Sequence, residues 1–558
     1  SLIKGETDAS SFPNGGLRSV FEARGLIKWD FTYQPFLKEN NNGLVLCIPT
    51  TFEAPGGISL DKRTPLLNSC DALNKQLLRM LRLFDDNETS ETFSSIGIEQ
   101  EYFLIKKDVF GKRKDLILTG RTLFGKTIMV SSSNNYMIVI DDETEKFMNK
   151  VEKELWKLGV PAQVKHNEVS PRQCELVPHY EDLKNASNHD FLTMEVLQRE
   201  AKNQGLVCLL NEKPFKGING SGKHINWSIN TDSGKNLFSF GNTPKDNAMF
   251  ITMIVALVSA VDKHSDLIRA IVASSDNDNR LSGFEAPSSI VSIYLGKELT
   301  NILEKISNDE IKLGETIIEL SQACMIDRNR TSPFAFLGNR FEFRMPGSSS
   351  SVTECATVLN TIMAEAISTI TLQLENSKDF YRDLQKIIID LYNKHSKIIY
   401  NGNSYSKEWE KEAKTRGLKN IKSAPETFKS FIDNNSIKMF EKFNVYRKEE
   451  LISRYKIKLE KYIKNIELEA KIMIEMVSLD ILPQVLKYAN FLKDTIDKID
   501  ALEYEKDQLN KLINLINSTN ELLNKFESNM DEMKLTEGIT TIFEIGNLAN
   551  KYIDDKTP

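Results

Sequence analysis

The sequence predicts a mixed α and β protein with a helical C-terminal part, and three observations support this. In the first 346 residues, short β-like runs such as 94–105 and 222–230 alternate with helical stretches such as 143–158 and 248–272. This alternation is typical of an α+β or α/β arrangement. Thirteen of the 16 prolines lie at or before Pro346. Because proline removes a backbone donor and interrupts helices, the remaining residues are free to be helical.

The length and composition limit the class of protein. A chain of 558 residues is long enough for two or three domains, and 40% hydrophobic with 27% charged residues is typical of globular proteins. The net charge of −6 gives no electrostatic reason to expect nucleic acid or an anionic membrane as a partner. The six cysteines form no C-x-x-C pair, so we expect reduced thiols rather than a zinc ribbon or redox motif.

The longest apolar run indicates a buried helix rather than a membrane span. It extends from Ala248 to Val261, which is shorter than the ~18 residues that span a bilayer. We therefore expect a soluble, cytoplasmic protein. Because the sequence opens on Ser1 without Met or a signal-like segment, we interpret it as a fragment of a longer chain.

The first chemical pattern is a pair of carboxylates in GIEQEYF. The apolar neighbours of Glu99 and Glu101 favour a strand, and residues two apart on a strand point to one face. Two adjacent carboxylates are unfavourable unless a cation or proton separates them. The alternative is a half-solvated edge strand, where two glutamates do no harm.

Two further motifs add an acidic cluster and an imidazole. The stretch 165–178 contains His166, Glu168 and Glu175. The stretch 217–229 begins like a phosphate-binding loop, but a histidine and a strand-like pattern follow where that loop needs a hydroxyl and a helix. We therefore reject the phosphate loop and predict a glycine-rich turn leading into a strand. On that strand His224, Asn226 and Ser228 share one face, although a lone histidine on a strand is more often a structural hydrogen-bonding group.

The fourth pattern places arginines around a carboxylate. Arg340, Glu342 and Arg344 alternate with two phenylalanines, and Arg328 and Arg330 precede them. Arginine binds phosphate or carboxylate through two parallel hydrogen bonds. A surface ladder of ion pairs is the alternative, and it fits poorly because the opposite face of the strand is aromatic.

The C-terminal part carries a short heptad pattern. Apolar residues recur every seven positions from 502 to 526, and three heptads are too few for a long coiled coil. We favour an antiparallel helix hairpin over a short coiled coil, with a stripe formed by Leu502, Leu509, Leu512, Ile516, Leu523 and Phe526.

Together the four motifs suggest two-metal phosphoryl transfer. Five carboxylates and one imidazole are an oxygen-rich donor set for two divalent cations. The arginines would hold anionic phosphate. This reasoning reaches a reaction class and names no substrate.

The same motifs resemble a known family. GIEQEYF, HNEVSPRQCEL, NGSGKH, NRLSGFEAP and RNRTSPFAF occur in the order found in glutamine synthetases, and the chain resembles the large-subunit type III form most closely. The segments 12–25 and 46–52 and the helical C-terminal extension also match that form. The resemblance covers about 10–375 well. It implies an α+β fold with a β-grasp-like domain over 1–75 that lacks its beginning. A glutamine synthetase/guanido kinase-like catalytic domain with a curved antiparallel sheet over 76–375 and a helical region over 376–558 would follow.

The resemblance also implies roles for individual residues. One metal site would contain Glu101, Glu168 and Glu175, and the other would contain Glu99, His224 and Glu342. Five residues are matched to the substrate glutamate: Asn219 and Gly220 to its amino-acid head, Arg280 to its α-carboxylate, Arg344 to the region near its γ-carboxyl, and Glu101 to a metal ligand that faces the substrate. Four residues are matched to the nucleotide: Arg330 and Arg340 to its phosphates, and Asn226 and Ser228 to the stretch that lines it. Glu285 matches the flap carboxylate that takes a proton from ammonium.

The activity implied is ATP-dependent ligation of ammonia to glutamate through γ-glutamyl phosphate, with two or more Mg²⁺ or Mn²⁺ ions per active site. The family further implies a homo-oligomer, a stacked-ring dodecamer. Ser282 stands where the family usually has glycine, and we expect this change to stiffen the flap. A γ-glutamyl-amine ligase and a catalytically inactive structural or regulatory relative are the alternatives.

Overall fold

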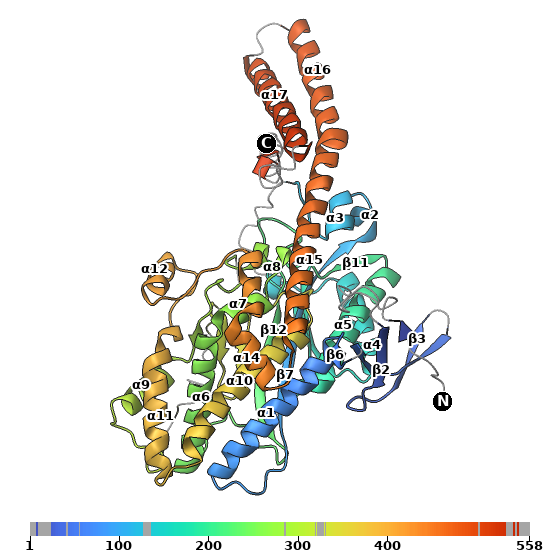
Figure 1. The fold of residues 1–558 in the computed structure, drawn as a ribbon. Coiled ribbons are helices and arrows are strands. Elements are labelled where there is room, and N and C mark those ends of the chain that lie inside the picture. The colour runs from blue at the N-terminus through green and yellow to red at the C-terminus, as the bar shows by residue number, and fades with distance from the viewer. Residues whose placement is uncertain are drawn as a thin grey trace. The chain divides into compact units, whose positions relative to one another are not determined.

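The structure is a computed structural model that describes residues 7–8, 24–40, 43–54, 56–125, 135–283, 286–318, 320, 329, 331–499, 503–531, 540–541 and 544–545. The chain forms two compact units. The first consists of Ser1–Leu104, Asn134–Glu212 and Asn219–Glu460, and the second of Ile105–Ser133, Lys213–Ile218 and Lys461–Pro558. All described residues of the predicted site lie in the first unit. Figure 1 shows the helices and strands of the whole chain.

A nine-stranded sheet forms the centre of the first unit. The strands follow the order β13-β14-β15-β12-β7-β9-β8, and β10 and β11 also pair with β7. Pairing along this path is antiparallel except between β13 and β14, which are parallel. The sheet is therefore mixed: the expected antiparallel pairing holds along this path except for one parallel pair at the β13 edge. The strands are β7 (Thr92–Lys106), β8 (Ala162–Asn167), β9 (Gln173–Pro178), β10 (Glu181–Asp182), β11 (Leu206–Leu209), β12 (Lys223–Thr231), β13 (Ile293–Tyr294), β14 (Phe334–Phe336) and β15 (Phe341–Phe343).

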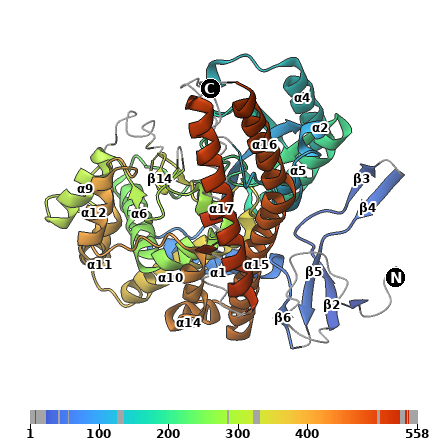
Figure 2. The same cartoon turned by 90° about the horizontal axis from the view of Figure 1, so that it is seen from above.

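Smaller strands precede this sheet in the chain. A four-stranded sheet has the order β1-β2-β5-β6, and β3 and β4 form a separate two-stranded sheet (Figure 2). Their bounds are β1 (Thr7–Asp8), β2 (Arg24–Trp29), β3 (Phe36–Asn40), β4 (Gly43–Cys47), β5 (Thr50–Ala54) and β6 (Ile58–Ser59).

Two helices of the first unit are apolar enough to cross a membrane by length and composition, α6 (Pro244–Lys263) and α10 (Val352–Leu374). In both, 83% of the apolar window is buried inside the protein, so they are core helices. The prediction of a buried helix at Ala248–Val261 is confirmed.

The predicted helix 248–272 is two helices in the structure. It divides at His264, whose backbone leaves the helical region at φ −114° and ψ 24°, and α7 (Ser265–Ile271) follows. The ring of His264 is buried, and its Nε2 lies 2.6 Å from Oε2 of Glu365 on α10. The first unit also contains α1 (Arg63–Leu83), α4 (Asp142–Lys157), α5 (Leu183–Asn203), α8 (Ser275–Arg280), α9 (Lys297–Ser307), α11 (Phe380–His395), α12 (Lys407–Thr415), α13 (Ala424–Phe428), α14 (Asn434–Lys442) and the beginning of α15 (Lys448–Glu475).

The second unit is helical. It contains α2 (Lys107–Phe110), α3 (Lys114–Thr119), the end of α15 (Lys448–Glu475), a π-helical turn (Met476–Ile481), α16 (Leu482–Lys498) and α17 (Glu503–Asp531). Leu512 of α17 is buried against Val485 and Leu492 of α16, with Leu509 and Ile516 packed beside it. The predicted helix hairpin is confirmed (Figure 1), although Leu502 lies outside the described residues.

Candidate active site

Strand register brings the predicted site residues together. His224 pairs with Glu99, Glu101 pairs with Glu175, and Asn226 pairs with Glu342. Because paired residues on adjacent strands have side chains on the same face, these groups form one patch on the sheet. On the opposite face of β12, Ile225, Trp227 and Ile229 are fully buried, as the alternating pattern predicts.

The first cluster joins Glu99, His224 and Glu342, as expected. The Nδ1 atom of His224 lies 2.9 Å from Glu99 Oε2 and 3.6 Å from Glu342 Oε1. One ligand atom from each residue lies within 4.8 Å of the others, which is close enough for all three to bind one cation.

The second cluster differs from the expected set in one member. His166, Glu168 and Glu175 bring their ligand atoms within 4.8 Å of one another. His166 Nε2 lies 2.8 Å from Glu175 Oε2, and its Nδ1 lies 3.7 Å from Glu168 Oε1. Glu101, which was expected to complete this set, pairs with Glu175 across β7 and β9, and its Oε1 lies 3.8 Å from His224 Nε2. Its place among the ligands of this cluster stays a prediction. The sequence signal for His166 was its position two residues before Glu168, near the end of β8.

The pKa values of this patch are shifted in both directions by burial and by neighbouring groups. Burial and the nearby charge of Glu168 raise the pKa of Glu101 to about 7, although His224 and Arg280 oppose them. The hydrogen bond that His166 donates to Glu175 outweighs burial and raises the pKa of His166 to about 9. Burial alone would raise the pKa of Glu99, but hydrogen bonds from His224 and Asn226 outweigh it and lower the pKa to about 2.

These residues fit divalent cations. Carboxylate oxygens with imidazole nitrogens are a donor set that Mg²⁺ and Mn²⁺ accept. Several of the groups are buried, and buried carboxylates close together are unfavourable without a cation or proton between them. In addition, the buried Nε2 atom of His224 has no hydrogen-bond partner among the described residues.

The residues matched to substrate glutamate lie beside the clusters. Asn219 is buried, and its backbone N–H donates to Ser170 Oγ at 2.9 Å. Arg344 is buried, and its Nε and Nη1 have no hydrogen-bond partner in the part of the chain that is described. Arg280 is engaged with the protein, because its guanidinium donates to the main-chain oxygens of 344, 345 and 346 at 3.2–3.3 Å.

The residues matched to nucleotide connect to the first cluster through hydrogen bonds. Asn226 Nδ2 donates to Glu99 Oε1 at 2.8 Å, and Arg340 Nε donates to Asn226 Oδ1 at 3.2 Å. Ser228 Oγ donates to the main-chain oxygen of Asn339 at 2.8 Å. This chain of contacts places an arginine next to a candidate metal cluster, as phosphate binding requires.

The segment matched to the family's flap is described only in part. Glu285, and Arg330 further along the chain, lie outside the described residues. Ser282 adopts a φ of 63°, the left-handed region that glycine occupies most easily. Its backbone N–H donates to Pro287 O at 2.9 Å, and its Oγ accepts the N–H of Ser289 at 3.3 Å. The serine therefore keeps a backbone conformation suited to the glycine that the sequence comparison expected here.

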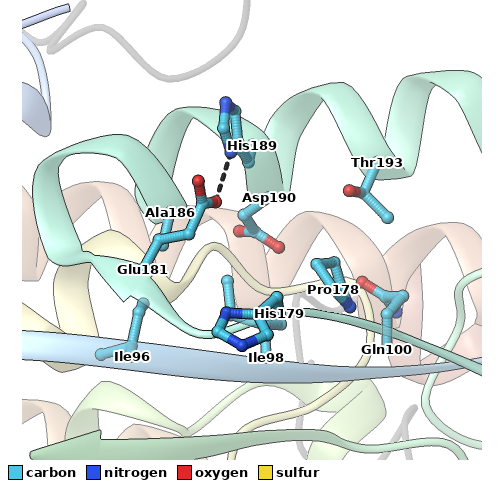
Figure 3. Close-up of a pocket in the computed structure, with 10 residues that line it drawn as sticks. All are labelled: Ile96, Ile98, Gln100, Pro178, His179, Glu181, Ala186, His189, Asp190 and Thr193. Carbon is cyan, nitrogen blue, oxygen red and sulfur yellow. Dashed lines mark hydrogen bonds and ion pairs between the residues drawn. The ribbon is translucent and has the colours of Figure 1, made fainter. Parts of the chain in front are cut away.

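A pocket behind β7 is separate from these clusters. Figure 3 shows Ile96, Ile98 and Gln100 of β7 beneath α5, with His189 of α5 paired to Glu181. These even-numbered residues of β7 alternate with Glu99 and Glu101, so the pocket and the carboxylates lie on opposite faces of the sheet. The pocket is therefore not the place where the clusters would meet a substrate.

Comparison with known proteins identifies the family. The chain matches the models "Glutamine synthetase type III N terminal" over residues 1–69, "Glutamine synthetase, catalytic domain" over 75–292 and "Glutamine synthetase C-terminal domain" over 383–500. It is 38% identical to the type-3 glutamine synthetase of Dictyostelium discoideum, covering 99% of this chain and 78% of that protein. A glutamine synthetase of Bacteroides fragilis is 38% identical over 91% of this chain and 71% of its own length.

A solved structure supports the fold. The cryo-EM structure of Plasmodium falciparum glutamine synthetase aligns with a TM-score of 0.53 at 17% identity, covering 82% of this chain and 86% of that one. The fold and the clustered donors define an enzyme with a glutamine synthetase catalytic domain, a glutamate–ammonia ligase. The chain belongs to the type III glutamine synthetase family.

Proposed function

We propose that this site forms glutamine in two steps through the residues assigned above. ATP first phosphorylates the γ-carboxylate of glutamate, which releases ADP. Ammonia then attacks the acyl phosphate and displaces inorganic phosphate. Direct attack on the carboxylate is blocked because the leaving group would be oxide, whereas phosphate is a good leaving group.

The observation that carries this proposal is the register of four strands. Pairings between β7, β9, β12 and β15 put donors from distant parts of the chain on one face. One cation would be held by Glu99, His224 and Glu342, and another by Glu168 and Glu175 with His166 or Glu101. When bound, two divalent cations neutralise charge on the transferring phosphoryl group.

The protein's own side chains divide the remaining work. Arg340, with Arg330, orients the phosphates. Arg344, whose Nε and Nη1 have no hydrogen-bond partner among the described residues, stabilises charge near the γ-carboxyl. Asn219, Gly220 and Arg280 shape the site for the amino-acid head, and Asn226 and Ser228 line the nucleotide site. Glu285 on the flap removes a proton from ammonium, because ammonium itself has no lone pair for attack. Flap closure excludes water, which would otherwise hydrolyse the acyl phosphate.

The proposal also covers the domain organisation, the assembly, the location and the cation. The segment 1–75 would be a β-grasp-like domain, followed by a catalytic domain over 76–375 and a helical region over 376–558. The enzyme would act in the cytoplasm as a ring-forming homo-oligomer, with Mg²⁺ or Mn²⁺ as the cation. Sedimentation of the purified chain tests the assembly: a fully active monomer would contradict it.

The direct test is phosphate release by the purified chain with ATP and Mg²⁺. We expect release that depends on both glutamate and ammonium, together with glutamine as product. Replacement of ammonium by methylamine or ethylamine separates this activity from γ-glutamyl-amine synthesis. Release that prefers the larger amine would favour that alternative, and no release with any amine would favour an inactive relative.

A further inference from the structure

A buried glutamine connects the second cluster to the turn matched to glutamate. Gln173, at the start of β9, is only 2% exposed. Its Nε2 lies 3.0 Å from the main-chain oxygen of Gly220, 3.2 Å from Glu101 Oε2 and 3.4 Å from Ser221 Oγ. Its two amide protons are therefore shared between a carboxylate and the turn at 219–221.

The backbone of Gln173 also holds Glu168 of the same patch. Its main-chain oxygen accepts the N–H of Glu168 at 2.8 Å, and Glu175 follows it by two residues on β9. Its Oε1 accepts the N–H of Ser170 at 3.3 Å, and Ser170 Oγ accepts the N–H of Asn219. Gln173 thus contacts the acidic patch, at Glu101 and Glu168, and also the turn, at Gly220.

These contacts determine which oxygen of Glu101 faces the clusters. Oε2 of Glu101 accepts from Gln173 and, at 2.8 Å, from the backbone N–H of Gly222. The other oxygen, Oε1, is the one that lies 3.8 Å from His224 Nε2. Without the amide of Gln173, Glu101 would lose one of the two hydrogen bonds that hold its carboxylate in this orientation.

The turn itself has little freedom to compensate. A Cβ on Gly220 would lie 2.4 Å from the main-chain oxygen of Glu212, so the backbone of Gly220 is already in close contact. Movement at Glu101 would therefore be passed through Gln173 to a tightly packed turn rather than absorbed there.

We propose that Gln173 is a positioning residue that couples cation binding at Glu101 to glutamate binding at the turn formed by Asn219 and Gly220. The inference rests on the proposed function, since it takes glutamate as the ligand of that turn. Coupling is reciprocal: Mn²⁺ should tighten glutamate binding by the same factor by which glutamate tightens Mn²⁺ binding. Gln173 does not itself touch the reacting atoms.

The test compares the parent with Gln173→Met, which keeps the length of the side chain and removes its hydrogen bonds. Mn²⁺ binding is measured by electron paramagnetic resonance with and without glutamate, in the absence of ATP. We expect the parent to bind Mn²⁺ several-fold more tightly with glutamate, and Gln173→Met to lose most of that difference. The KM for glutamate should rise about tenfold, as the loss of hydrogen bonds to a charged group predicts, with a smaller change in kcat.

Gln385→Met is the matched control. Gln385 is also buried and hydrogen-bonded, with its Nε2 2.9 Å from Ile311 O, and it belongs to α11 rather than to the sheet. It should retain the coupling, and an equal loss in this control would assign the effect to general destabilisation and overturn the inference. Unchanged coupling in Gln173→Met would overturn it as well. The binding assay needs no turnover, so a parent that couples Mn²⁺ to glutamate but releases no phosphate would contradict the proposed function alone.

Discussion

The buried ion pair beneath β12 makes a strong prediction about stability. Lys223 and Asp190 have side chains that are 0% and 1% exposed, and Lys223 Nζ lies 2.7 Å from Asp190 Oδ1. Lys223 Nζ also donates to Ser350 O at 2.6 Å, and Asp190 Oδ2 accepts the N–H of Val352 at 3.2 Å. Lys223→Met keeps the volume of the aliphatic side chain but leaves the carboxylate of Asp190 buried without its partner.

The expected loss is large because the two charges are fully enclosed. Removal of one partner of a buried pair costs about 3–5 kcal/mol, since the remaining charge is uncompensated. The double variant Lys223→Met/Asp190→Asn should recover at least half of that loss. The amide oxygen of asparagine can still accept the N–H of Val352, and no charge remains to be buried.

Urea unfolding followed by circular dichroism, at one protein concentration for all variants, measures these differences. Lys150→Met is the control, because Lys150 forms an i,i+4 pair with Glu154 while its own side chain is 48% exposed. This variant should lose less than about 1 kcal/mol. If Lys223→Met lost no more than the control, or if the double variant were no more stable than the single one, the reasoning would be wrong.

Three further predictions concern the site, an acid-sensitive pair and the cations. Gly220→Ala should raise the KM for glutamate about tenfold or more in steady-state assays, because its Cβ would lie 2.4 Å from the main-chain oxygen of Glu212 and displace the turn; an unchanged KM would contradict this placement. Burial alone would raise the pKa of Glu365, but hydrogen bonds from His264 and Lys263 lower it to about 2, below its ordinary 4.5. This carboxylate therefore adds stability above about pH 4.5 that is lost as the pH falls toward 2, and the difference in unfolding free energy between parent and Glu365→Gln should shrink by about 3 kcal/mol over that range; a difference independent of pH would refute it. Mn²⁺ at 100 times its Kd should stabilise the parent by about 2.7 kcal/mol per site in thermal unfolding, and an equal shift in His224→Asn would remove His224 from the ligands.

The side chains that share a face of the sheet could be predicted from the sequence, because strand alternation is local. Glu99, Glu101, His224 and Glu342 each lie on a strand with period-2 patterning, and the structure places them on one face. The grouping of donors around each cation could not be predicted in this way. It depends on the pairing of β8 with β9, whose register shifts between Ala162 and Val164. This pairing brings His166 to Glu175 on the side opposite its other cross-strand neighbour, Glu101.

The break at His264 shows the same limit among helices. Apolar runs lie before Asp262 and after Asp266, and neither Pro nor Gly stands between them, so the local pattern gives no strong stop signal. The structure pairs this histidine with Glu365, 101 residues further along the chain. A contact between residues so far apart leaves no trace in the local periodicity on which the helix prediction depended.

The position of the candidate metal-binding face is determined partly by what lies behind it. Lys223 and His224 are consecutive on β12, so their side chains point to opposite faces of the sheet. Lys223 is held to Asp190 of α5, and Asp190 accepts the N–H of Val352 at the start of α10. A shift of β12 by one residue would exchange the two faces, removing His224 from Glu99 and placing it in the apolar layer while the charge of Lys223 lost its partner. The buried pair therefore opposes such a shift by several kcal/mol. In this way the ion pair of Lys223 with Asp190, which lies on the opposite face from the candidate site, fixes the register on which the cluster of Glu99, His224 and Glu342 depends.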